Sequence, residues 1–204
     1  MNSGKAIGKA RGYAITDART VHDGYSRLLV ATVRPPQGDS FHREIEDHGN
    51  AVAVLPYDPE RRTAVLVRAM RPPVLLTAGE QELLEVPAGM IEDESAEETA
   101  RREALEEAGL RLGALDHVGR VWSTPGVSTE RIDLFLAPYG AADRVADGGG
   151  LASENEDITV VEMAMAELDA MLAAGAIADL KTMVLLLALK DRRPDLFASG
   201  GPGA

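Results

Sequence analysis

The sequence predicts an α+β fold in which helices cover both sides of a mixed β-sheet. Strand-like segments rich in Val, Leu and Ala occupy much of the first 140 residues, and helical patterns lie between them and after them. This order of elements is typical of a sheet that is covered by helices. A chain of 204 residues is long enough for one domain with an accessory element and a substantial core.

The strand-like segments are bounded by Pro, Gly and Asp, which favour turns. They are residues 27–34, 41–48, 51–55, 63–70, 116–121, 131–137 and 157–163. The first two flank a Pro-Pro-Gln-Gly-Asp turn and predict a hairpin, and residues 81–86 lead into a helix. Two more helices are expected near 166–174 and 179–191. Residues 141–153, with a run of three glycines, and the tail 198–204 are expected to be mobile.

Residues 95–108 predict a helix with well-defined ends. The segment lacks Gly and Pro, is rich in Ala and Glu, and stops before Gly109, a good left-handed cap. Ser95 followed by Glu98 has the spacing of a capping box. The helix lies within residues 88–110, which carry eight carboxylates against two arginines, and therefore half of the net charge of −12.

Glu103 and Glu107 are four residues apart on this helix, so both project from one face. Such oxygen-rich pairs suit Mg²⁺ or Mn²⁺, and Glu106 could reach the edge of the same site. Arg102 can pair with Glu106 and hold the carboxylates in place. The residues alone leave a second interpretation open, a solvated acidic helix without a ligand.

Composition excludes several other functions. The chain has no Cys, which removes disulfides, thiol catalysis and Cys-ligated zinc. The net charge of −12 argues against a nucleic-acid partner. The longest apolar run, Met183 to Leu189, is too short to span a bilayer. No signal-peptide pattern follows Met1, so we expect a cytoplasmic protein that does not bind membranes.

The acidic helix resembles the signature of the Nudix hydrolases, G-x5-E-x7-R-E-U-x-E-E-x-G-U, where U is a bulky apolar residue. From Glu94 onward the spacing matches in full: seven residues, then Arg102-Glu103-Ala104, Glu106-Glu107 and Gly109-Leu110. Two departures are a preceding loop one residue shorter than the pattern and the small Ala104 at a U position. The shorter loop affects the role of Glu94 rather than that of Glu103 or Glu107.

The resemblance extends over residues 43–196 and is strongest to the Nudix enzymes that cleave nucleoside diphosphate sugars, the ADP-ribose pyrophosphatases and GDP-mannose hydrolases. The segments that carry it are 65–71, 84–89, 124–130, 154–158 and 175–182, together with Gly148–Gly150. It implies a Nudix-type α/β/α sandwich with an N-terminal β-domain. It also implies a homodimer in which residues 1–48 cross to the partner, with the Nudix domain at 49–197 and a flexible tail at 198–204.

The implied reaction is attack of water on a diphosphate link. ADP-ribose, the substrate that we expect first, would give AMP and ribose 5-phosphate, and GDP-mannose would give GMP and mannose 1-phosphate. Mg²⁺, or Mn²⁺ in its place, would polarise phosphoryl oxygens and activate the water. By resemblance, the metal ligands are Glu103 and Glu107, with Glu106 secondary and the carbonyl of Ala88 as a backbone ligand.

The resemblance also places residues around the substrate. Arg71 and Arg68 would contact the diphosphate, because a planar guanidinium suits paired oxygens. Glu85 would support the metal or the sugar, and the loop that ends at Glu130 would shape the pocket. The general base would be Glu154, with Glu156 as the second candidate.

Structural interpretations of these residues stay open: a surface strand end for the arginines, a solvent-facing strand residue for Glu85 and a plain acidic loop for Glu154. The alternative function is a catalytically silent Nudix-type module that binds a nucleotide sugar as a regulator. The intact Glu103, Glu106, Glu107 and Arg102 favour the enzyme over that alternative.

Overall fold

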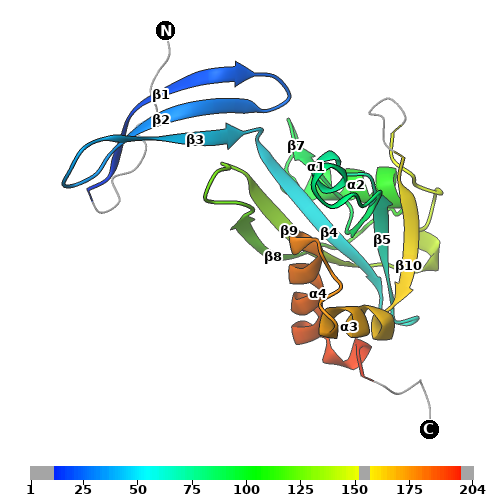
Figure 1. Ribbon diagram of the computed structural model, residues 1–204. Helices are drawn as coiled ribbons and strands as arrows, with labels where there is room; N and C mark the ends of the chain where they lie inside the picture. Colours follow the sequence, from blue (N-terminus) through cyan, green and yellow to red (C-terminus); the bar gives the residue numbers. More distant parts are fainter. Residues whose placement is uncertain (1–11, 152–156, 199–204) are drawn as a thin grey trace. The chain divides into compact units, whose positions relative to one another are not determined.

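The computed structural model describes residues 12–151 and 157–198, which form parts of two compact units. Unit 1 contains the chain up to Asn50 together with Trp122–Arg131, and unit 2 contains Ala51–Val121 and the chain from Ile132 onward (Figure 1). The expected division into 1–48, 49–197 and a tail stays a prediction. The sequence analysis did not foresee that residues 122–131 belong with the N-terminal segment.

Unit 1 is built on a three-stranded antiparallel sheet of order β1-β2-β3. Its strands are β1 (Ala14–Asp23), β2 (Arg27–Arg34) and β3 (Phe41–Asp47). The predicted hairpin is confirmed as the β2–β3 pair. The sequence analysis missed β1, because this strand is exposed over nearly its whole length and lacks the apolar alternation that marks a half-buried strand.

Residues 122–131 attach to β3 within unit 1. The amide of Glu46 donates to the carbonyl of Val127 over 2.8 Å, and the amide of Thr129 donates back to the carbonyl of Glu46 over 3.0 Å. The two segments thereby form a short parallel bridge at Glu46 and Ser128. A loop late in the sequence is in this way fixed to the end of the N-terminal sheet.

Unit 2 contains a seven-stranded mixed sheet in which β4 and β9 run parallel and β4–β5, β5–β6 and β5–β10 run antiparallel. The main order is β10-β5-β4-β9-β8, with β6 paired to β5 and β7 paired to β4. The strands are β4 (Asn50–Asp58), β5 (Thr63–Ala69), β6 (Leu83–Glu85), β7 (Ala88–Ile91), β8 (Asp116–Trp122), β9 (Arg131–Pro138) and β10 (Thr159–Ala164). The predicted strands are present, and the short strands β6 and β7 are additions.

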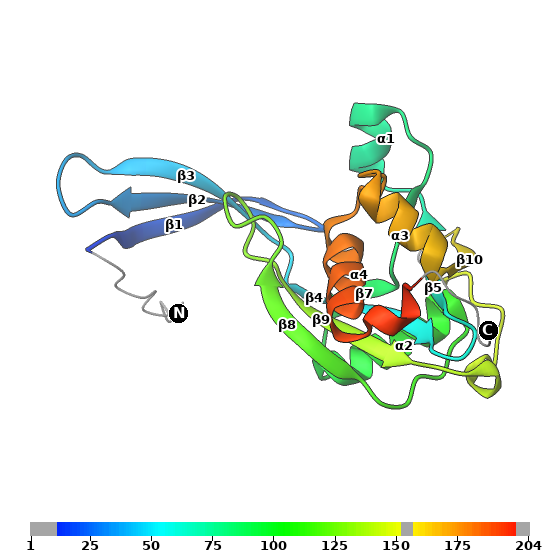
Figure 2. The same ribbon diagram turned by 90° about the horizontal axis from the view of Figure 1, so that it is seen from below.

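Helices cover both faces of this sheet, as predicted (Figure 1 and Figure 2). They are α1 (Pro72–Ala78), α2 (Ala96–Ala108), α3 (Met165–Ala173) and α4 (Leu180–Arg192), with 3-10 turns η1 (Ala141–Asp143) and η3 (Pro194–Leu196). The short α1 was not predicted, because its Pro72-Pro73 start has the pattern of a loop. Proline is nevertheless tolerated in the first turn of a helix, where the missing N–H has no partner to lose.

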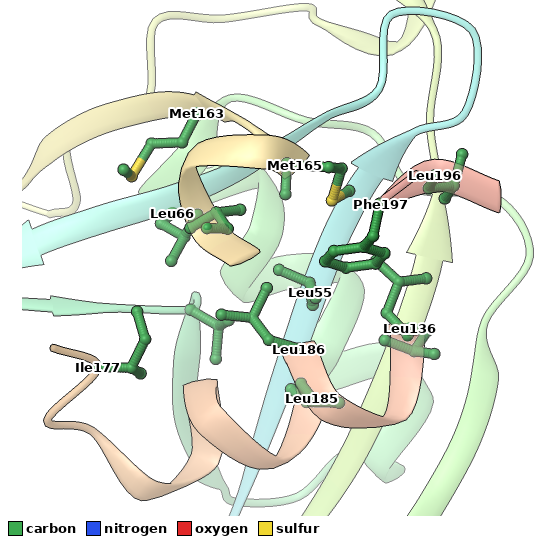
Figure 3. Packing of buried hydrophobic residues seen from close by; sticks show 14 of the residues in the cluster. Leu55, Leu66, Leu136, Met163, Met165, Ile177, Leu185, Leu186, Leu196 and Phe197 are labelled. Atoms are coloured by element: carbon green, nitrogen blue, oxygen red, sulfur yellow. The ribbon is translucent and has the colours of Figure 1, made fainter. Parts of the chain in front are cut away.

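Alternation along β4 divides the core into two clusters. Val52 and Val54 pack with α2, whereas Ala53 and Leu55 pack with α3 and α4. Figure 3 shows the second cluster, in which Leu185 and Leu186 of α4 lie against Leu55 and Leu136 of the sheet. The expected α+β fold with helices on both faces is thus confirmed.

The side of α2 that faces the sheet consists of Ala100, Ala104 and Ala108, all fully buried. Three alanines at spacings of four let the helix approach the sheet closely. The small Ala104, a departure from the signature, is therefore a packing residue. Within the described ranges, no helix is both long and apolar enough to cross a membrane.

Candidate active site

Helix α2 begins and ends as its sequence predicts. Ser95 caps it with the expected capping box: the amide of Glu98 donates to Ser95 Oγ over 3.2 Å, and the amide of Ser95 donates to Glu98 Oε2 over 3.0 Å. Gly109 closes it in the left-handed conformation with φ of 69°. These caps fix the start and the end of the helix, and so the direction in which its glutamates project.

Glu103 and Glu107 are the buried carboxylates of α2, with exposures of 8% and 2%. Both lie against the segment Ala88–Gly89, where β7 begins. The amide of Ala88 donates to Glu107 Oε2 over 3.1 Å. A Cβ at position 89 would lie 1.9 Å from Glu103 Oε1, so any residue other than glycine would force the Glu103 side chain to move. The two buried carboxylates therefore meet at the start of β7.

Arg102 binds three carboxylates near the contact between α2 and the start of β7. Its guanidinium lies 3.2 Å from Glu94, 2.9 Å from Glu103 and 2.9 Å from Glu106. Burial lowers the pKa of Arg102, but the charge of Glu103 and the contacts with Glu94 and Glu106 outweigh it and raise the pKa above its usual value. The expected pair between Arg102 and Glu106 is present. Glu94 also reaches Arg102, although the loop before it is one residue short.

The donor set around α2 suits a divalent cation. Buried carboxylates beside the backbone carbonyls at the start of β7 offer the hard oxygen atoms that such ions prefer. Within the described residues, however, no three His, Asp or Glu side chains are arranged to hold an ion by themselves. The described carboxylates alone therefore do not make up a complete ion-binding site.

The carboxyl end of α2 is joined to the glycine run. The amides of Gly149 and Gly150 donate to the carbonyls of Glu107 and Glu106 over 2.9 and 3.1 Å. Gly148 has φ of 76°, and a Cβ there would lie 2.5 Å from the Glu107 carbonyl oxygen. This corrects the expectation of a mobile stretch as far as Gly150, because the run is anchored to the helix that carries the glutamates.

A second group of charges surrounds Glu85 at the end of β6, and we call Arg71, Glu85, Asp179 and Lys181 the Glu85 cluster. The Glu85 side chain is 1% exposed, and Arg71 Nε lies 2.7 Å from its Oε1. Lys181 contacts its other oxygen and lies 3.0 Å from Asp179. Glu85 is therefore buried between two cations, which excludes the solvent-facing interpretation.

Arg71 precedes α1 and keeps 42% of its side chain exposed. Burial lowers its pKa, but the hydrogen bond and charge of Glu85, together with the charges of Glu107 and Asp179, raise it above the usual value. The sequence analysis did not single out Lys181 as a site residue. The signal that could have found it is its place in segment 175–182, which carries part of the family resemblance.

The remaining expected site residues are more dispersed. Arg68 lies inside β5, opposite Leu84 and Thr159, and is partly buried. Glu130 belongs to unit 1, where its Oε1 lies 3.2 Å from His48 Nε2. Glu154 and Glu156 lie outside the described residues.

Comparison with known proteins agrees with this arrangement. Residues 47–184 match the NUDIX domain model. The chain is 39% identical over 151 residues to the GDP-mannose pyrophosphatase of Cronobacter sakazakii, covering 74% of this chain and 78% of that protein. It is 39% identical over 145 residues to the protein of the same name from Pectobacterium atrosepticum, covering 71% and 74%.

A solved structure described as an ADP compounds hydrolase superposes with a TM-score of 0.72. It covers 93% of this chain and 98% of that chain at 17% sequence identity, which shows the shared fold. The chain belongs to the NUDIX domain family. Hydrolases of this family generally require a divalent metal ion.

Proposed function

We propose that this chain is a Nudix hydrolase that cleaves the diphosphate link of a nucleoside diphosphate sugar. The observation that carries the proposal is the signature helix, with Glu103 and Glu107 buried side by side against Ala88–Gly89. The relatives named GDP-mannose pyrophosphatase make GDP-mannose the first substrate to test, with GMP and mannose 1-phosphate as products. ADP-ribose, which the sequence analysis placed first, becomes the second candidate.

In this proposal Glu103, Glu107 and the carbonyl of Ala88 hold Mg²⁺, or Mn²⁺ in its place, and Glu106 contributes at the edge. A bound divalent ion polarises phosphoryl oxygens and lowers the pKa of a coordinated water. Arg102 keeps the carboxylates of α2 oriented through its three contacts. The amide of Ala88 fixes one oxygen of Glu107, which leaves the orientation of that carboxylate little freedom.

Arg71 is the proposed diphosphate ligand of the chain. Its ion pair with Glu85 orients the guanidinium, and its exposure leaves it accessible to a phosphate. Glu85 acts through this arginine, and Arg68 and Glu130 are further proposed substrate contacts. Glu154 or Glu156 is proposed to remove the proton from the attacking water, on the family resemblance alone.

We also propose that the protein is a homodimer with exchanged N-terminal β-domains. Light scattering after gel filtration tests this assembly, since a mass near 21.7 kDa would identify a monomer and contradict it. The cytoplasmic location expected from the sequence stays a prediction, which cell fractionation would check.

The experiment that tests the activity is a phosphatase-coupled assay of phosphate release from a panel of nucleoside diphosphate sugars, with and without Mg²⁺. The coupling phosphatase acts on the monoester products but not on the intact diphosphate. Mg²⁺-dependent release from GDP-mannose or ADP-ribose is expected. Silence across the panel, with a nucleotide sugar still bound by calorimetry, would support the regulatory module instead.

Glu103→Gln and Glu107→Gln should each lower kcat by about 10²-fold or more, because each removes a charge from the proposed metal site. Glu97→Gln is the matched control, since Glu97 lies on the same helix but is exposed. Circular dichroism of each variant checks that the fold is kept. Wild-type turnover in either variant would overturn the metal assignment.

A further inference from the structure

Glu130, a proposed substrate contact, is held inside unit 1 by a group of side chains on residues 46–48 and 128–130. We call Glu46, His48, Ser128 and Glu130 the His48 cluster. Ser128 Oγ donates to Glu46 Oε2 over 2.7 Å and accepts from the amide of Glu130 over 3.1 Å. The cluster thus joins the end of β3 to the loop that carries Glu130.

His48 lies between two carboxylates. Its Nδ1 contacts Glu46 Oε1, and its Nε2 lies 3.2 Å from Glu130 Oε1. The three side chains are only 20%, 28% and 18% exposed for His48, Glu46 and Glu130. The ring of Tyr25 stacks near the imidazole with a centroid separation of 6.3 Å. These contacts fix the imidazole plane and restrict water around both ring nitrogens.

The protonation state of His48 decides how many of these contacts are hydrogen bonds. A neutral imidazole has one N–H and can donate to one carboxylate, whereas an imidazolium donates to both. Only the imidazolium can therefore donate hydrogen bonds to Glu46 and Glu130 at the same time. Because a neutral imidazole has no charge and only one N–H for two carboxylates, loss of the proton weakens the hold of His48 on Glu46 and Glu130 together.

We propose that His48 is a positioning residue for Glu130, and that its proton holds Glu130 and the loop around it in the orientation used for substrate. This inference rests on the proposed function, in which Glu130 contacts the nucleoside diphosphate sugar. The groups that face His48 are Glu46 of β3, Glu130 of the loop and the ring of Tyr25. The neighbouring Asp47 is bound to Arg27 and Thr129.

The electrostatics of the cluster set the direction of the effect. Burial lowers the pKa of His48, but the hydrogen bonds and charges of Glu46 and Glu130 outweigh it and raise the pKa above 6.5. Burial raises the pKa of Glu46, but hydrogen bonds from Ser128, Ser26 and His48 lower it below its usual value, so this carboxylate stays charged. The contact of His48 with Glu130 is therefore complete at pH 6 and is lost as the pH rises through the raised pKa.

Two substitutions separate charge from shape. His48→Arg keeps a cation at every pH, whereas His48→Gln removes the charge. His22→Gln is the control, because His22 lies exposed in β1. The wild-type protein should show a rise of KM between pH 6 and 8.5 of up to about tenfold, the order of effect expected for the loss of one hydrogen bond. Both His48 variants should lack this rise, with a low KM for His48→Arg and a high KM for His48→Gln.

A magnetic resonance titration tests the coupling without any substrate. The imidazole of His48, one of four histidines, should titrate together with the amides of Val127 and Thr129 in the wild type and in His22→Gln. The two amides should not follow that titration in His48→Gln or His48→Arg. The proposal would be overturned if the chemical shifts of the two amides did not change as His48 titrates in the wild type. It would also be overturned if KM still depended on pH in both His48 variants. Absence of hydrolysis from the whole panel would contradict the proposed function, while the titration would still decide the coupling.

Discussion

The Glu85 cluster of unit 2 and the His48 cluster of unit 1 are opposite arrangements of the same charges. In the first, one buried carboxylate lies between the cations of Arg71 and Lys181. In the second, one imidazole lies between two carboxylates. Arginine and lysine keep their charge throughout the physiological range, whereas histidine changes its charge within it. The first arrangement is therefore permanent, and the second depends on pH.

The difference in burial matters as much as the difference in charge. Glu85 is 1% exposed, so its carboxylate depends on its cations in place of water. His48, Glu46 and Glu130 keep 20%, 28% and 18% of their side chains exposed, so water can replace a lost contact. The Glu85 cluster is suited to hold Arg71 in one orientation, and the His48 cluster is suited to release Glu130.

Glu85→Gln should cause the largest loss of stability, because it removes the buried charge of the Glu85 cluster. The amide keeps the shape but removes the buried anion between Arg71 and Lys181, which should cost about 3 kcal/mol of unfolding free energy. Urea unfolding followed by far-ultraviolet circular dichroism measures it, because all described helices lie in unit 2. Glu82→Gln, three residues away and exposed, is the control. A loss no larger than that of the control would show that the cluster is not a stabilising one.

Thr182→Val tests whether the same cluster also depends on neutral hydrogen bonds. Thr182 is fully buried, its Oγ1 accepts from the amide of Val86 over 2.9 Å, and it donates to Asp179 over 2.5 Å. Valine has a similar shape but removes both hydrogen bonds and leaves the amide of Val86 without its partner, which should cost about 2 kcal/mol in the same unfolding experiment. The exposed Thr77→Val should change little. If Thr182→Val and Thr77→Val lost the same stability, the neutral hydrogen bonds of Thr182 would not contribute, and the cluster would be stabilised by its charges alone.

The features that the sequence predicted best are those set by spacings between nearby residues, such as helix caps and the faces of a helix or strand. The capping box at Ser95, the left-handed Gly109 and the common face of Glu103 and Glu107 all follow from spacings within one helix. The alternation of β4 between the two core clusters follows in the same way from a period of two. Local spacing therefore sufficed to predict how the carboxylates are arranged on α2, which is the part of the candidate site proposed to bind metal.

The sequence could not predict contacts between distant segments. Lys181 and Glu85 are 96 residues apart, and His48 and Glu130 are 82 residues apart. No period or motif links such positions in one chain without homologues. The sequence analysis assigned His48 no role for the same reason, because an isolated histidine has no ligand spacing and its two carboxylates come together only when residues 122–131 fold onto β3.

The smallest expected effect is the pH dependence of the stability of His48→Arg, which tests whether the two clusters differ in their response to pH. Because the pKa of His48 is raised on folding, the stability that its cation contributes is complete below pH 6.5 and is lost as the pH rises through the folded value. The unfolding free energy of His48→Arg should therefore rise relative to that of the wild type between pH 6 and 8.5, by no more than about 1 kcal/mol for a partly exposed cluster.

Fluorescence of Trp122 measures this difference, because the only tryptophan of the chain belongs to unit 1, the unit that contains His48. Since Glu85→Gln removes a permanent ion pair, its loss should be the same at both pH values. A difference between wild type and His48→Arg that does not change with pH would mean that His48 acts in this cluster by its shape and not by its proton.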